Sequence, residues 1–152
     1  MGEDKSESEM EFYEELAHFY LTAFRQFSVL PQAAILRNRE GKGWKADVDF
    51  VALDFSSQTI YLIEVSNSSD YPAKAVERLH ENNYKNIESY IRSEILKNEL
   101  SSFKIVWWLF VRERHIARLQ REACYLSYRE SGGHCEVQSL QRVLDEFKSR
   151  LD

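Results

Sequence analysis

The stretch from Trp44 to Ser69, WKADVDFVALDFSSQTIYLIEVSNSS, decides the fold. It contains two apolar runs, Lys45–Phe55 and Thr59–Ser66, separated by a short polar turn. Strands that are apolar on both faces are normally central strands of a sheet. The stretch therefore predicts a buried β-hairpin. Its acids Asp49 and Glu64 need a partner or a cation, because a buried carboxylate is otherwise costly.

The register of this hairpin decides whether the two acids meet. If Ser56 and Ser57 form the tip of a two-residue turn, Asp49 faces Glu64 and Asp47 faces Ser66, all on one face of the sheet. A three-residue loop would shift the register by one residue and place Asp49 and Glu64 on opposite faces. The first register predicts an acid pair, and the second predicts none.

An acid pair in this position points to a metal site. Directly opposed residues have Cβ atoms about 5 Å apart. Carboxylates this close repel each other unless a proton or a metal ion lies between them. Mg²⁺ is often held by one or two carboxylates together with substrate phosphates. The pair therefore predicts half of a Mg²⁺ or Mn²⁺ site for phosphate chemistry. The alternative is purely structural, with both acids at a solvated sheet end.

Outside the hairpin, periodicity and turn residues predict a mixed α/β sheet flanked by helices, in one domain over residues 9–152 that follows a disordered acidic tail over 1–8. A linker ending at Pro31 follows the first helix, and the helix over 72–98 suggests a crossover to a parallel neighbouring strand. The expected elements are helices at 9–27, 72–98, 114–129 and 140–151, and strands at 33–39, 103–111 and, at a sheet edge, 135–138. Trp107 and Trp108 alternate along the strand over 103–111, so one is expected to pack on each face.

Composition limits the remaining choices. The chain has 152 residues, 43% of them hydrophobic, and no apolar run long enough to span a membrane. We expect no membrane partner. The N-terminus lacks the features of a signal peptide, and Cys124 and Cys135 form no disulfide framework, so a cytoplasmic location is expected.

The net charge of −5 argues at first against nucleic-acid binding, but the charge is unevenly distributed. Residues 1–15 contain seven acids and one Lys, a net −6, so the remainder sums to +1. A basic run, Arg37, Arg39, Lys42 and Lys45, precedes Asp49. Such a run suits a phosphate backbone, with Trp44 as a candidate for base stacking, but on the run alone a solvated loop with ordinary surface charges is the favoured explanation.

The order of elements and the two acids resemble the PD-(D/E)XK nuclease-like superfamily, which includes restriction endonucleases and Holliday-junction resolvases. The resemblance covers about residues 10–112. It implies an α-β-β-β-α-β core, with Asp49 in DVDFVALD and Glu64 in IYLIEVS as the metal-binding acids. It also implies that Glu15 of the first helix completes the metal site. Many members dimerise, so a homodimer is compatible with the resemblance.

The departure from this family is at Ser66, which occupies the position of the family's catalytic Lys. Serine carries no positive charge. Lys74 or Arg78, in the following helix, are candidates to supply the cation instead, or a metal-bound water carries the reaction alone.

Two functions follow from the resemblance. The first is a metal-dependent nuclease that hydrolyses nucleic-acid phosphodiester bonds, with DNA favoured over RNA. Its catalytic residues would be Asp49, Glu64, Lys74 and Ser66, and Arg78 would contact the nucleic acid together with the basic run. The second is a catalytically degenerate module that binds nucleic acid or a protein partner without cleavage, as Ser66 and the acidic tail suggest.

Overall fold

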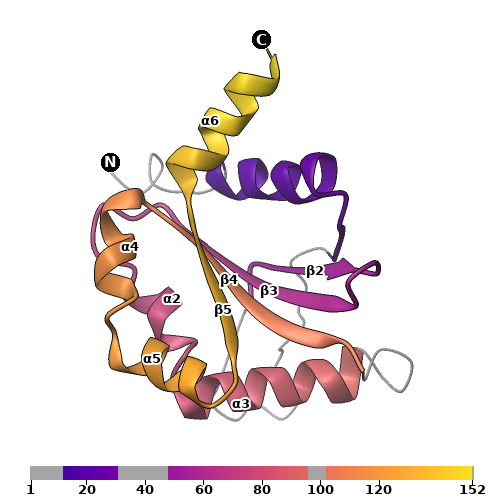
Figure 1. Ribbon diagram of the computed structural model, residues 1–152, viewed down its shortest axis with the longest axis vertical. Helices are drawn as coiled ribbons and strands as arrows, with labels where there is room; N and C mark the ends of the chain where they lie inside the picture. The colour runs from indigo at the N-terminus through magenta and orange to yellow at the C-terminus, as the bar shows by residue number, and fades with distance from the viewer. Residues whose placement is uncertain (1–11, 31–47, 96–101, 152) are drawn as a thin grey trace, which may run out of the picture.

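The protein, seen in a computed structural model, is an α/β structure with a five-stranded mixed sheet flanked by helices (Figure 1). Residues 12–30, 48–95 and 102–151 are described. The strands are β1 (Ser28–Leu30), β2 (Phe50–Asp54), β3 (Thr59–Ser66), β4 (Lys104–Val111) and β5 (His134–Ser139). The helices are α2 (Ala73–Glu77), α3 (Glu81–Tyr90), α4 (Glu113–Leu119), α5 (Ala123–Glu130) and α6 (Leu140–Leu151). Residues 12–19 form an N-terminal α-helix that continues into the π-helical turn η1 (Tyr20–Phe24), and η2 (Ile91–Ile95) extends α3.

The strands lie in the order β1-β2-β3-β4-β5. β1 and β2 are antiparallel, as are β2 and β3, whereas β4 is parallel to β3 and β5 is parallel to β4. A parallel neighbour requires a crossover connection, and α2, α3 and η2 provide it between β3 and β4. The expected mixed sheet, the parallel placement of β4 and the edge position of β5 are therefore confirmed.

Two apolar clusters cover the two faces of the sheet. One contains Leu62 and Trp107 together with buried residues of α2, α3, α4 and α5. The other contains Ile63 and Trp108 together with residues of the N-terminal helix and α6. Adjacent strand residues therefore point to opposite faces, as expected for the Trp pair. Figure 1 shows the corresponding arrangement, with α2, α4 and α5 on one side and the N-terminal helix and α6 on the other.

Several boundaries differ from the prediction. The predicted helix over 72–98 is interrupted between α2 and α3, where His80 has an extended backbone (ψ 140°). The predicted helix over 114–129 is likewise two helices, α4 and α5. The expected linker before Pro31 contains β1, and β2 is shorter than the predicted 45–55 run. The predicted strand over 33–39 lies outside the described residues.

A serine hydroxyl caps the helix at the junction between β5 and α6. Ser139, the last residue of β5, is buried, and its Oγ accepts a hydrogen bond from the backbone N–H of Arg142 at 3.2 Å. This is an N-cap geometry, which satisfies one of the free N–H groups at the start of α6. Helix α6 begins directly after this cap, and its observed range matches the predicted range of 140–151.

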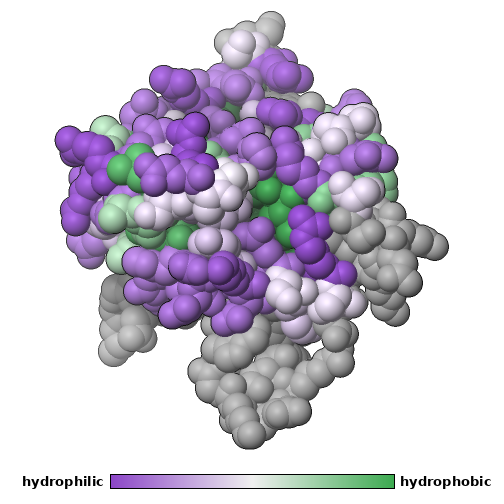
Figure 2. All heavy atoms as spheres, turned by 60° about the horizontal axis from the view of Figure 1, so that its bottom comes forward, coloured by the Kyte–Doolittle hydropathy of each residue, from purple (hydrophilic) through white to green (hydrophobic). Residues whose placement is uncertain are grey.

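The outer surfaces of the helices are polar. Hydrophilic residues cover most of the described surface on the side where α3 comes forward (Figure 2). Within the described part of the chain, no helix has the length and apolar character needed to cross a bilayer.

Candidate metal and nucleic-acid site

The register of the β2–β3 hairpin places Asp49 beside Glu64. The pairs run from Asp54↔Thr59 to Phe50↔Ile63, so the next step along both strands sets Asp49 opposite Glu64. The register is therefore the one predicted for a two-residue turn, although pairing stops one step earlier and residues 55–58 form the turn.

The turn itself fixes this register. The Asp54 carboxylate accepts hydrogen bonds from the Ser56 backbone N–H at 3.1 Å, the Ser56 Oγ at 2.7 Å and the Ser57 Oγ at 2.6 Å. Gln58 adopts a positive φ of 52°, which closes the turn. Because side chains alternate along β3, Glu64 points to the face that α2 and α3 cover, and Asp49, directly before β2, lies close to it.

Each acid has a defined partner. Asp49 Oδ2 accepts a hydrogen bond from the backbone N–H of Val65 at 2.8 Å, which ties the end of β2 to β3. Glu64 Oε1 forms an ion pair with Arg78 Nε at 3.0 Å. The two side chains of this ion pair are only 12% and 21% exposed, respectively. Arg78 caps the C-terminal end of α2, so three separate elements meet at the pair.

Two conditions raise the pKa of Glu64, namely burial and a neighbouring like charge. Burial raises the pKa of Glu64 well above its usual range, and the neighbouring Asp49 carboxylate raises it further. Arg78 acts in the opposite direction, but burial and Asp49 prevail. When both acids are ionised, this cluster of two carboxylates and one guanidinium carries a net negative charge.

This donor set fits a hard divalent cation. Two carboxylates whose repulsion raises a pKa gain from a cation placed between them. Across residues 12–30, 48–95 and 102–151, no three His, Cys, Asp or Glu side chains come together that could hold a metal ion. The described side chains therefore offer two carboxylate ligands, and Mg²⁺ bound in this way completes its shell with water or substrate oxygens.

The other predicted site residues lie as follows. Ser66 ends β3, half-buried, on the same face as Glu64. Lys74 is exposed in α2 and forms no ion pair with a described residue. Glu15 is exposed on the N-terminal helix, which covers the opposite face of the sheet, so it does not join the pair. Arg37, Arg39, Lys42, Trp44 and Lys45 lie outside the described residues.

One contact beside the site was not anticipated. Arg112 follows directly after β4, and its Nε donates to the backbone oxygen and the Oδ1 of Asn67, at 2.9 and 3.0 Å. Asn67 follows Ser66, so this guanidinium anchors the loop that leaves the acid pair. No periodic signal marks Arg112, since its role depends on the parallel pairing of β3 with β4.

A second unanticipated residue is Glu88, which accepts a hydrogen bond from the indole of Trp107. A signal for it does exist in the sequence. A Trp in the middle of a buried strand needs an acceptor for its N–H, and the preceding helix is the nearest source of one.

Comparison of the chain with family models, curated proteins and solved structures finds no match.

Proposed function

We propose that this protein is a divalent-cation-dependent nuclease that hydrolyses phosphodiester bonds in nucleic acid. The observation that carries the proposal is the side-by-side placement of Asp49 and Glu64, nearly enclosed at the end of the hairpin, with a cationic side chain on Glu64. Purely structural strand-end acids would be expected to diverge into solvent, whereas the Asp49 carboxylate lies close enough to raise the pKa of Glu64.

The order of elements supports a restriction-endonuclease-like core. A helix precedes three antiparallel strands, and a helical crossover leads to β4, parallel to β3. This order is compatible with the α-β-β-β-α-β core that the resemblance implies, and α4, α5, β5 and α6 follow it.

Each residue has a distinct role in this proposal. Asp49 and Glu64 hold Mg²⁺ or Mn²⁺, and the hydrogen bond from Val65 N–H keeps the Asp49 carboxylate oriented. The chemistry that a divalent cation would supply at this site is polarisation of a phosphoryl oxygen and a lower pKa for an attacking water. Arg78 takes the charge-stabilising role in place of Lys74, because its guanidinium forms an ion pair with the Glu64 carboxylate.

A specific observation favours a second candidate, a binding module that does not cleave. The ion pair with Arg78 already compensates one of the two carboxylates, and Ser66 supplies no second cation. In that case the nuclease core is retained as a binding surface for nucleic acid or a protein partner.

The test is metal-dependent cleavage. The purified protein is incubated with Mn²⁺ and labelled single-stranded, duplex and branched DNA and RNA. We expect cleavage by the wild type and a loss of at least about 100-fold in Asp49→Asn, which removes the charge but keeps an acceptor for Val65 N–H. Glu77→Gln is the matched control, because Glu77 is an exposed acid on α2 and its loss should leave cleavage unchanged.

Either outcome is informative. Cleavage that requires both Mn²⁺ and Asp49 supports the nuclease. If the folded wild type cleaves none of the substrates, the nuclease is rejected and the non-cleaving module is favoured. Cleavage that persists in Asp49→Asn would also contradict the proposed site.

A further inference from the structure

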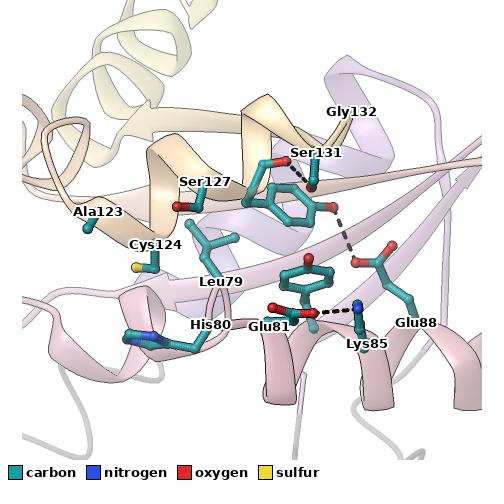
Figure 3. A pocket seen from close by; sticks show the side chains of 13 residues that line it. Leu79, His80, Glu81, Lys85, Glu88, Ala123, Cys124, Ser127, Ser131 and Gly132 are labelled. Atoms are coloured by element: carbon teal, nitrogen blue, oxygen red, sulfur yellow. Dashed lines mark hydrogen bonds and ion pairs between the residues drawn. The ribbon is translucent and has the colours of Figure 1, made fainter.

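A second site lies in the cleft between α3 and α5. Its volume is about 740 Å³, and residues of both helices line it together with the turn that follows α5 (Figure 3). Tyr84 and Glu88 come from α3, and Cys124, Ser127 and Tyr128 come from α5. None of the residues assigned to the proposed nuclease site lines this cleft.

Glu88 is a positioned carboxylate that is hydrogen-bonded by neutral donors, with the charge of Arg92 acting on it from the next helical turn. Its Oε2 accepts hydrogen bonds from Trp107 Nε1 at 3.2 Å and from the Tyr128 hydroxyl at 3.3 Å. Both donors belong to buried side chains, and both are neutral. Within the described part of the chain, Glu88 forms no ion pair. Burial raises the pKa of Glu88, whereas the hydrogen bonds from Trp107 and Tyr128 and the charge of Arg92 lower it in part.

Two cations of the same helix and its extension bind other groups. Arg92 acts on Glu88 through its charge, but its guanidinium donates to the backbone oxygen of Phe103 at 3.3 Å. Lys85 forms an ion pair with Glu81 at the mouth of the cleft, and Figure 3 shows this pair beside Glu88. Both side chains of the pair are largely exposed, and their charges cancel. The net charge of the cleft is therefore that of Glu88 alone when this group is ionised.

Aromatic rings form the adjoining walls. Tyr84 and Tyr128 pack edge to face with their centroids 4.7 Å apart. The Tyr128 ring lies directly against the backbone of Gly133, where a Cβ atom would come within 2.5 Å of the ring. Glycine at this position thus allows the ring to lie where its hydroxyl reaches Glu88. Aromatic faces attract cations, and the attraction is larger when the cation is removed from water.

We propose that this cleft binds a small organic monocation, an alkylammonium or quaternary ammonium group, with Glu88 as its countercharge and Tyr84 and Tyr128 as its aromatic walls. The ligand class follows from complementarity. A carboxylate without a paired cation repels anions, and the neighbouring rings favour a cation that carries apolar carbon around its charge. This inference is independent of the proposed nuclease function.

The probe is tetramethylammonium chloride, titrated into the full-length ¹⁵N-labelled protein at constant ionic strength. The indole N–H signal of Trp107 reports on the site, because this N–H donates directly to Glu88. The indole of Trp108, which packs on the opposite face of the sheet, is an internal reference. We expect a saturable shift of the Trp107 signal and no comparable shift of the Trp108 signal.

Three variants test the assignment. Glu88→Gln keeps an acceptor for Trp107 and Tyr128 but removes the charge, and we expect at least about a tenfold loss of affinity. Tyr84→Leu removes one aromatic wall and should also weaken binding. Glu130→Gln, an exposed acid on α5 that does not line the cleft, should bind as the wild type does.

The proposal is overturned if sodium chloride produces the same shift as tetramethylammonium chloride, or if Glu88→Gln binds with unchanged affinity. A saturable wild-type response that is weakened in Tyr84→Leu supports the site even if Glu88→Gln does not fold. Absence of any saturable response in the folded wild type rejects it.

Discussion

Glu64 is an almost buried carboxylate beside a second carboxylate, and both conditions favour its protonated form. Its folded-state pKa lies above the ordinary value of 4.5, with burial as the main cause and Asp49 as the next. The folded protein therefore binds this proton more tightly than the unfolded chain does. The resulting stabilisation is complete below about pH 4.5 and is lost as the pH rises through the folded-state pKa.

This sign gives a prediction for Glu64→Gln. The free energy of unfolding of the wild type should decline, relative to that of the variant, as the pH rises from 4.5 to 8, because only the wild type must release the proton. The measurement is urea unfolding of both proteins across this range. Glu81→Gln is the control, since the hydrogen bond from Lys85 lowers the pKa of Glu81 below 4.5. Its titration therefore lies below most of this pH range, and its curve should run nearly parallel to that of the wild type. Parallel curves for the wild type and Glu64→Gln would contradict the electrostatic description of the pair.

Some contacts at the site depend on local sequence and could be predicted, and others could not. Asp49 and Glu64 were placed together because hairpin register is local, set by a turn that Asp54, Ser56 and Ser57 hold. The choice between Lys74 and Arg78 was not local. It depends on where α2 ends and how it lies over β3, and the structure brings Arg78 alone to Glu64. Glu15 was misplaced for the same reason, because spacing along a helix does not reveal which face of the sheet the helix covers.

At the scale of elements, strands were predicted better than helices. β3 matches its predicted range because its mainly apolar run is bounded by polar residues on both sides. The helix over 72–98 was predicted as continuous because the apolar period carries across the break. At the break, the Asn83 Nδ2 donates to the backbone oxygen of Glu77 at 2.6 Å. This carbonyl also accepts a hydrogen bond from the His80 N–H, so Asn83 adds a second link between the end of α2 and the first turn of α3.

This contact predicts the effect of Asn83→Ala. Loss of the hydrogen bond should cost about 1 kcal/mol of stability and increase amide exchange at the junction of α2 and α3. Asn82→Ala is the matched control, because Asn82 is the exposed neighbour on the same helix and should change stability by less than about 0.5 kcal/mol. The measurements are thermal unfolding and hydrogen exchange. Equal effects of the two substitutions would show that the Asn83 amide does not stabilise the junction.

At the scale of the whole molecule, the sheet separates two layers of helices that differ in the polarity of the side chains they cover. The layer with the N-terminal helix and α6 covers Ile63 and Trp108, and the named members of its core are apolar or aromatic. The layer with α2 to α5 covers Leu62 and Trp107, and it also holds the half-buried charges of Glu64 with Arg78 and of Glu88 with Trp107. Candidate chemistry is therefore concentrated on one face of the sheet.

A cation bound at Asp49 and Glu64 would connect β2 and β3 and stabilise the folded molecule as a whole. By mass action, metal at a hundred times its dissociation constant should add about 2.7 kcal/mol to the free energy of unfolding. The metal must displace the proton that Glu64 holds, so the gain should be larger at pH 8 than at pH 5. The measurement is the midpoint of thermal unfolding with Mg²⁺ or Mn²⁺ and with sodium chloride at matched ionic strength. Asp49→Asn should abolish the gain at both pH values. A metal-induced rise that is equal at both pH values, or that persists in Asp49→Asn, would place the cation elsewhere on the protein.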